Sequence, residues 1–77
     1  MSIGSELRKA RQRANLTQEQ VSHLAECDRS YLSCIERDEQ SPTADFLFRL
    51  CDSLNVRLST LIAAVERSPH PLVAMGA

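Results

Sequence analysis

The sequence predicts an all-α fold with five helices. Apolar residues recur at helical spacing along most of the 77 residues, and this spacing buries one face of each helix. Residues that favour helix ends stand between these stretches, and no stretch shows the apolar–polar alternation of a strand. The length and the 43% hydrophobic content indicate one globular domain, near the lower size limit for an unassisted core.

The first predicted helix spans residues 2–14. Ile3, Leu7 and Ala10 form its apolar face. Asn15 should end it, because asparagine is one of the few residues besides glycine that accept a left-handed conformation. The first 16 residues carry three more positive than negative charges, although the net charge of the whole chain is −1. This excess is typical either of a basic face for phosphates or of an ordinary solvated helix.

The second predicted helix, residues 18–25, has the clearest start in the sequence. Thr17 and Gln20 are spaced as a capping box, in which each side chain accepts a hydrogen bond from the backbone N–H of the other. Leu16 and Val21 flank the box and can close a hydrophobic staple over it. These four residues predict a helix that begins at position 18.

The third predicted helix, residues 29–37, has two faces of different character. Leu32 and Ile35 continue the apolar face of the second helix. A helix that buries one face and exposes hydrogen-bonding groups on the other fits a DNA major groove. The exposed face offers short or forked side chains, namely Arg29, Ser30 and Ser33.

Two more helices are predicted towards the C-terminus. Thr43 should cap the fourth, with Asp45 in its first turn and Asn55 at its end. The fifth covers residues 58–66 and carries more apolar surface than so small a monomer needs, so this surface either forms a dimer interface or only closes the monomer core. The apolar residues are Leu58, Leu61, Ile62 and Val65, and Leu72 and Val73 follow in the tail.

The composition excludes several classes of protein. No apolar run is long enough to cross a membrane, no signal peptide is evident, and three cysteines without CxxC spacing fit reduced thiols in the cytoplasm. Cys27 and Cys51 fall at apolar positions, as small core residues do. His23 lies four residues before Cys27, but no further ligand supports a zinc site. The sequence has no catalytic Ser-His-Asp or Cys-His set and no glycine-rich phosphate loop, so we expect neither an enzyme nor a cofactor.

The chain resembles the XRE-type helix-turn-helix domains of lambda-repressor and Cro-like regulators. The resemblance rests on L-T-Q-E at 16–19, R-S-Y-L-S at 29–33, I-E-R at 35–37 and S-P-T at 41–43, with the spacing to L-N-V at 54–56. The match runs from position 3 to position 62 without a gap. It implies a compact five-helix domain of the lambda-repressor type, with the helix-turn-helix motif at the second and third helices.

The resemblance also implies roles in DNA binding. Arg29 matches the family's main base-reading position, where arginine pairs with guanine O6 and N7 for roughly 1–3 kcal/mol of discrimination. Arg11 and Glu36 match an ion pair that ties the first helix to the end of the third. The other base-facing positions are Ser30, Ser33 and Cys34, and the resemblance implies phosphate contacts at Gln18 and near Thr43. Tyr31 and Arg37 are further candidates for phosphate contacts, Arg37 because it lies beyond the first two turns of the third helix.

Some positions depart from the family pattern or allow more than one interpretation. Glu26 stands where the turn usually has glycine, so either the turn differs or it holds a left-handed residue at a cost of roughly 1 kcal/mol. Cys34 can touch a thymine methyl, respond to oxidants or be neutral. Tyr31 can donate its hydroxyl to a phosphate or pack its ring against the second helix. Leu24 and Phe46 occupy positions that the family usually leaves polar, and both are expected to be exposed.

The expected partners are double-stranded DNA and a second copy of the chain. A two-fold dimer through the fifth helix sets two recognition helices ~34 Å apart, which matches a palindromic operator. We therefore expect a homodimeric transcriptional regulator with no small-molecule effector, either a phage or plasmid repressor or the controller protein of a restriction–modification system. The DNA-binding domain should cover residues 1–66, fifth helix included, and residues 67–77 form a C-terminal tail.

The alternative is a protein-interaction module, such as an antitoxin-like partner that does little direct DNA reading. Two features favour it, the acidic Asp28 beside Arg29 and the negative net charge of the chain.

Overall fold

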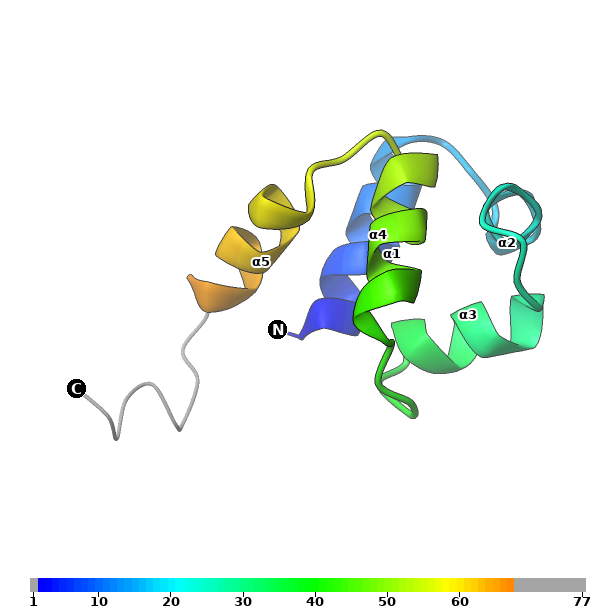
Figure 1. Cartoon of the computed structure of the whole chain (residues 1–77), viewed down its shortest axis with the longest axis horizontal. Coiled ribbons are helices and arrows are strands. Elements are labelled where there is room, and N and C mark those ends of the chain that lie inside the picture. The colour runs from blue at the N-terminus through cyan, green and yellow to red at the C-terminus, as the bar shows by residue number, and fades with distance from the viewer. Residues whose placement is uncertain (1, 68–77) are drawn as a thin grey trace.

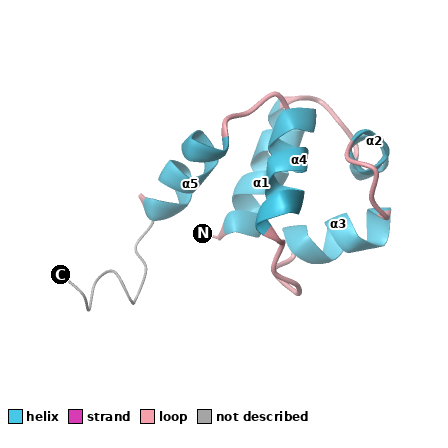
Figure 2. Ribbon diagram, viewed as in Figure 1, coloured by secondary structure: helices cyan, strands magenta, loops and turns pink. Residues whose placement is uncertain are grey.

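Residues 2–67 are described by the computed structural model of the chain, and all of their regular structure is helical (Figure 2). The helices agree with the sequence prediction in number and order, and their ends agree to within one residue. No helix among these residues is long and apolar enough to cross a membrane. The five helices are α1 (Ile3–Arg13), α2 (Gln18–Leu24), α3 (Arg29–Glu36), α4 (Ala44–Ser53) and α5 (Leu58–Glu66). The all-α prediction is confirmed.

The helices are arranged with α2 and α3 at one end of the molecule and α5 at the other, while α1 and α4 lie between them (Figure 1). Helix α1 packs against both α3 and α5, and α2 packs against α3 and α4. The α2–α3 pair is therefore held from two sides, and it leaves an outer surface open to solvent.

One hydrophobic core joins all five helices. Phe46 is part of it and is 3% exposed, so the expectation that Phe46 is exposed was wrong. Phe46 and Leu50 of α4 and the C-cap residue Leu54 follow one another at intervals of four and lie on one buried face, whereas Phe48 lies off this face and is 61% exposed. Leu24 is exposed, as expected. The core residues are Leu7, Ala10, Val21, Ala25, Leu32, Ile35, Phe46, Leu50, Cys51, Leu54 and Leu61.

Four of the five helices begin with a side chain that caps the backbone. Thr17 and Gln20 form the predicted capping box at α2, with bonds of 2.9 and 3.1 Å. A second box, which the sequence analysis did not identify, joins Ser2 and Ser5 at α1. Asp28 and Thr43 cap α3 and α4, whereas Arg57 at the start of α5 makes no side-chain capping bond. Local chemistry thus sets four of the five starts.

The first four helices end in the same way. The residue after each C-cap is left-handed, and the next N–H reaches back to a carbonyl five residues earlier, which is the Schellman motif. After α2, for example, the Cys27 N–H donates to the Ser22 carbonyl at 2.9 Å. None of the four left-handed residues is glycine: they are Asn15 (φ 58°), Glu26 (φ 55°), Asp38 (φ 60°) and Asn55 (φ 56°). The unusual residue at Glu26 therefore keeps the left-handed turn.

Glycine is required at one point of contact between helices. Gly4 is buried in α1, and a Cβ atom at this position would lie 2.2 Å from the carbonyl oxygen of Ile35 on α3. The Ser2 hydroxyl donates to the Asp38 carboxylate beside it. The start of α1 thus fits closely against the end of α3.

Candidate nucleic-acid interface

Helix α3 has one buried side and one exposed side, as the sequence predicted. Leu32, Ile35 and Glu36 are buried on one side. On the other side Arg29, Ser30 and Arg37 are exposed, and Ser33 and Cys34 are partly exposed. This outer face carries each residue for which the resemblance implies base reading.

Asp28 has a structural use at the start of α3. Its carboxylate accepts a hydrogen bond of 3.0 Å from the Ser30 N–H and so caps the helix. An acidic residue at this end also complements the helix dipole. Its presence beside Arg29 therefore has a local explanation and no longer supports the protein-interaction alternative.

Glu36 connects three parts of the chain from a buried position. Its side chain is 3% exposed and accepts hydrogen bonds from Arg11 Nε at 2.8 Å and Arg11 Nη2 at 3.1 Å. Gln18 Nε2, at the first residue of α2, donates to the same carboxylate at 3.0 Å. Arg11 also donates from Nη1 to the Leu16 carbonyl at 2.9 Å. These bonds fix α1, α2 and α3 relative to one another. Both charged groups of the cluster, Arg11 and Glu36, are paired, as buried charges must be.

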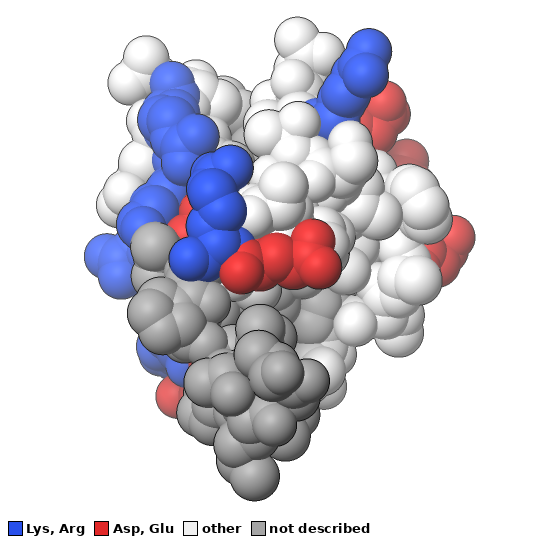
Figure 3. Space-filling model, turned by 90° about the vertical axis from the view of Figure 1, so that its left-hand side faces the viewer, with Lys and Arg blue, Asp and Glu red and all other residues white. Residues whose placement is uncertain are grey.

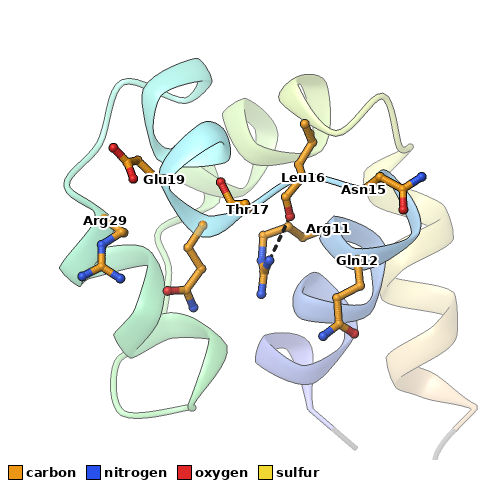
Figure 4. Close-up of a pocket in the computed structure, with 8 residues that line it drawn as sticks. Arg11, Gln12, Asn15, Leu16, Thr17, Glu19 and Arg29 are labelled. Carbon is orange, nitrogen blue, oxygen red and sulfur yellow. Dashed lines mark hydrogen bonds between the residues drawn. The ribbon is translucent and has the colours of Figure 1, made fainter.

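An open hollow of about 660 Å³ lies where the end of α1, the start of α2 and the start of α3 meet. Figure 4 shows Arg11, Gln12 and Arg29 pointing to the same side of this hollow, whereas the carboxylate of Glu19 points away from them. The lining residues are Arg11, Gln12, Asn15, Leu16, Thr17, Gln18, Glu19 and Arg29. The hollow thus brings together side chains that can donate hydrogen bonds to an anion.

Tyr31 links α3 to α4. Its ring packs edge-on against Phe46, with 4.8 Å between the ring centroids, and the Arg49 guanidinium lies 5.8 Å from the Phe46 centroid. The aromatic partner of Tyr31 is thus on α4, where the sequence suggested α2. Tyr31 remains partly exposed.

The other two residues expected to contact phosphates lie apart from the hollow. Thr43 caps α4, where its hydroxyl oxygen accepts a hydrogen bond of 3.1 Å from the Phe46 N–H. Arg37 follows α3 and is paired with Glu39, with 3.0 Å between Nη2 and Oε1. The hollow and these two residues therefore mark separate points on the molecule.

Cys27 and Cys51 behave as small apolar residues, with Cys51 in the core and Cys27 packed against it. Burial raises the pKa of the Cys51 thiol. Burial also raises the pKa of Cys27, an effect that Arg49 opposes and Asp28 strengthens. Both thiols therefore stay protonated at neutral pH. In the part of the chain that the structure describes, no three His, Cys, Asp or Glu side chains are grouped so that they could hold a metal ion.

The apolar residues of α5 differ in their exposure. Leu61 is only 4% exposed and belongs to the monomer core, whereas Ile62 is 36% exposed. Leu58 and Val65 are partly exposed, and Leu72 and Val73 lie outside the described residues. Figure 3 shows the end of the molecule that carries α5, where Lys and Arg gather along one side of a broad area without charged side chains.

Sequence reasoning did not identify every residue that the structure places at this surface. Gln12 and Asn15 line the hollow, but their place in and just after the predicted first helix did not indicate a shared site with Arg29. Glu39 is paired with Arg37 across the turn after α3. Glu39 follows the predicted third helix, and a spacing of two residues is not one at which side chains face each other on a helix, so the sequence did not predict this contact.

Comparison with known proteins identifies a family and several relatives. A family model described as "Helix-turn-helix" matches residues 7–61. The chain is 32% identical over 62 residues to the immunity repressor protein of Bacillus phage phi105, a match that covers 80% of this chain and 43% of the repressor. The chain spans about half the length of the curated relatives it matches.

Solved structures share the fold. SinR, described as the master regulator for biofilm formation and crystallised in complex with DNA, superposes with a TM-score of 0.75 at 31% identity, over 79% of this chain and 98% of the SinR chain. The restriction-modification controller protein C.AhdI from Aeromonas hydrophila superposes with a TM-score of 0.74 at 29% identity, over 77% of this chain and 89% of C.AhdI.

Proposed function

The chain belongs to the helix-turn-helix family, and we propose that it is a sequence-specific, DNA-binding transcriptional regulator. The observation that carries this proposal is the outer face of α3, where Arg29 stands at the helix start beside an open hollow lined with hydrogen-bond donors. In this role α3 is the recognition helix and enters the major groove.

Base reading is assigned to the outer face of α3. Arg29 is exposed at the first residue of the helix, so its forked guanidinium can reach guanine O6 and N7 without moving any packed element. Ser30 and Ser33 offer hydroxyls that donate and accept, and Cys34 offers a small apolar contact to a thymine methyl. These four residues would set which operator is bound.

Phosphate binding is assigned to the hollow and to the residues around α3. Gln18 is held by Glu36 through one N–H of its amide, which leaves the second N–H for a phosphate oxygen. Gln12 lies in the same hollow and adds a contact from α1 that the sequence did not suggest. Tyr31, Arg37 and Thr43 complete the backbone contacts. Such contacts fix the register of a recognition helix but carry no sequence information.

A homodimer through α5 would complete the regulator. Ile62 is the most exposed large apolar residue of α5, and Leu58 and Val65 lie at helical spacing from it. The buried Leu61 supports this face from within the monomer. A two-fold axis here would place two copies of α3 on successive major-groove turns, ~34 Å apart, and require a palindromic operator. The proposed DNA-binding domain covers residues 1–66 and so includes α5, and residues 67–77 form a tail. We place the protein in the cytoplasm, where thiols stay reduced.

The test of DNA reading is a fluorescence-anisotropy titration against DNA from upstream of the protein's own gene, across a series of salt concentrations. Wild-type affinity should fall steeply with salt, because phosphate contacts release counterions. Arg29→Ala should cost roughly 1–3 kcal/mol on the operator and much less on unrelated DNA. Asp52→Asn, a change on the exposed face of α4, is the matched control and should bind as wild type does.

The double variant Arg29→Ala, Gln18→Ala gives the decisive result. Binding that this variant leaves unchanged, or a wild-type protein that binds no DNA, would refute the regulator proposal and favour a protein-interaction module.

The dimer has its own experiment, analytical ultracentrifugation of Ile62→Glu. This change puts a charge on the exposed part of α5 without touching the core, so the variant should sediment as a folded monomer. Thr60→Glu, on the exposed side of α5 away from Ile62, is the control and should leave assembly as it is. An unchanged assembly in Ile62→Glu would rule out the α5 interface.

A further inference from the structure

We propose that Glu39 limits the affinity of this protein for DNA by holding Arg37 in an ion pair. The inference rests on the proposed DNA-binding function and concerns a residue to which neither the family resemblance nor the comparisons give a role. The pair lies at the C-terminal end of α3, at the opposite end of that helix from Arg29 and the hollow.

The Arg37 guanidinium lies on the DNA-facing side of α3. Its Nη2 atom is 3.9 Å from the Cys34 sulfur, and Cys34 belongs to the outer face of the helix together with Ser30 and Ser33. The same Nη2 atom is 3.0 Å from Glu39 Oε1. The cation is therefore at the proposed interface already, but its charge faces a carboxylate of the protein.

The backbone holds Glu39 in this position. Asp38 is left-handed with φ 60°, and the Glu39 N–H donates to the Cys34 carbonyl at 2.9 Å as part of the Schellman motif that ends α3. The turn folds Glu39 back against the last turn of the helix. The ordered backbone of this turn therefore brings the two side chains together, although residues two apart would not face each other on a helix.

The Arg37–Glu39 pair contributes little to the stability of the fold but should affect the affinity for DNA. Both side chains are more than half exposed, 58% for Arg37 and 56% for Glu39, and ion pairs of this kind add little to stability. DNA binding would require Arg37 to give up the attraction of the Glu39 carboxylate in exchange for a phosphate oxygen. Removing the carboxylate should therefore strengthen binding and leave stability almost unchanged.

The test is a Glu39→Gln variant in the anisotropy titration on operator DNA. We expect about two- to fivefold tighter binding at 0.1 M salt, the range given by exposed ion pairs. The plot of log affinity against log salt should also steepen by up to about 0.9, because a freed Arg37 neutralises one more phosphate. Asp52→Asn removes one carboxylate from the last turns of α4, away from α3, and should change neither quantity.

The Arg37→Ala background separates the proposed mechanism from general charge repulsion. If Glu39 acts through Arg37, Glu39→Gln should have little effect when Arg37 is absent. An equal gain in both backgrounds overturns the inference, as does no gain or a loss in the wild-type background. Wild-type binding that Arg29→Ala weakens keeps the regulator proposal in force even when Glu39→Gln fails, whereas absence of wild-type binding overturns both.

Discussion

Replacing Glu26 with glycine should make this protein more stable, although the change removes a side chain and adds none. Glu26 ends α2 in a left-handed conformation with φ 55°. Two hydrogen bonds hold it there, from its own N–H to the His23 carbonyl at 3.3 Å and from the Cys27 N–H to the Ser22 carbonyl at 2.9 Å. Its side chain is exposed, and no hydrogen bond or ion pair of its carboxylate occurs within residues 2–67. The turn thus imposes strain that the Glu26 side chain does not offset.

The size of the gain follows from two opposing terms. A left-handed conformation costs a residue with a Cβ atom roughly 1–2 kcal/mol, and glycine avoids this cost. Glycine also gives the unfolded chain more freedom, which takes back about 0.4–1 kcal/mol. The net gain should be about 0.5–1 kcal/mol, which raises the Tm of a domain of this size by roughly 2–8 °C.

Thermal unfolding followed by circular dichroism, at one fixed protein concentration, measures this shift. Glu26→Ala is the matched control, because it removes the same carboxylate but keeps the Cβ atom, and it should show no gain. If Glu26→Gly melts at or below the Tm of Glu26→Ala, the left-handed turn is not strained and the reasoning fails. DNA affinity should not change, because glycine keeps the same turn.

Three further predictions concern two contacts between helices and one buried thiol. Glu36→Gln leaves Arg11 partly buried without its carboxylate and should cost about 3–5 kcal/mol in urea unfolding. A double Arg11→Met, Glu36→Met variant should recover most of that loss, and no recovery would contradict the assignment. Gly4→Ala should cost about 1–3 kcal/mol because of overlap with the Ile35 carbonyl, so an unchanged urea midpoint would argue against so close an approach of α1 to α3. The last prediction concerns pH: burial raises the pKa of Cys51 above its ordinary value of 9.0, so the folded chain binds this proton more tightly than the unfolded chain. This contribution to stability is complete at neutral pH and is lost as the pH rises above about 9. Unfolding free energies measured from pH 7 to pH 10 should therefore fall less steeply in Cys51→Ala than in wild type, and parallel profiles would refute the effect.

The sequence predicts most of the fold because local signals mark most helix ends. The capping box at Thr17 and the asparagines at positions 15 and 55 need only neighbouring residues to act, and the structure has them as predicted. Phe46 was misassigned because its exposure was taken from the family pattern. The four-residue spacing to Leu50 places it in the core, and periodicity along α4 was the better guide.

The candidate site was less accessible to sequence reasoning, because its contacts join distant parts of the chain. The resemblance supplied the Arg11–Glu36 pair, but no local signal predicts that Gln18 shares the same carboxylate. The hollow between α1, α2 and α3 likewise depends on how the helices cross. The placement of Glu39 against Arg37 follows from a left-handed residue at Asp38, which the sequence analysis did not predict.

The glycine-free connections have a consequence for the DNA as well as for the protein. None of the segments between α1 and α5 contains glycine, and the four left-handed turns are closed by paired backbone hydrogen bonds. Stiff connections lower the entropic cost of ordering the protein on binding, but they also prevent the helices from adjusting to an imperfect duplex. We therefore expect the DNA duplex, and not the protein, to change its shape on binding. On the proposed homodimer model, operators should show sequence preferences at base pairs that no side chain touches, wherever the duplex must bend or narrow to meet both copies of α3.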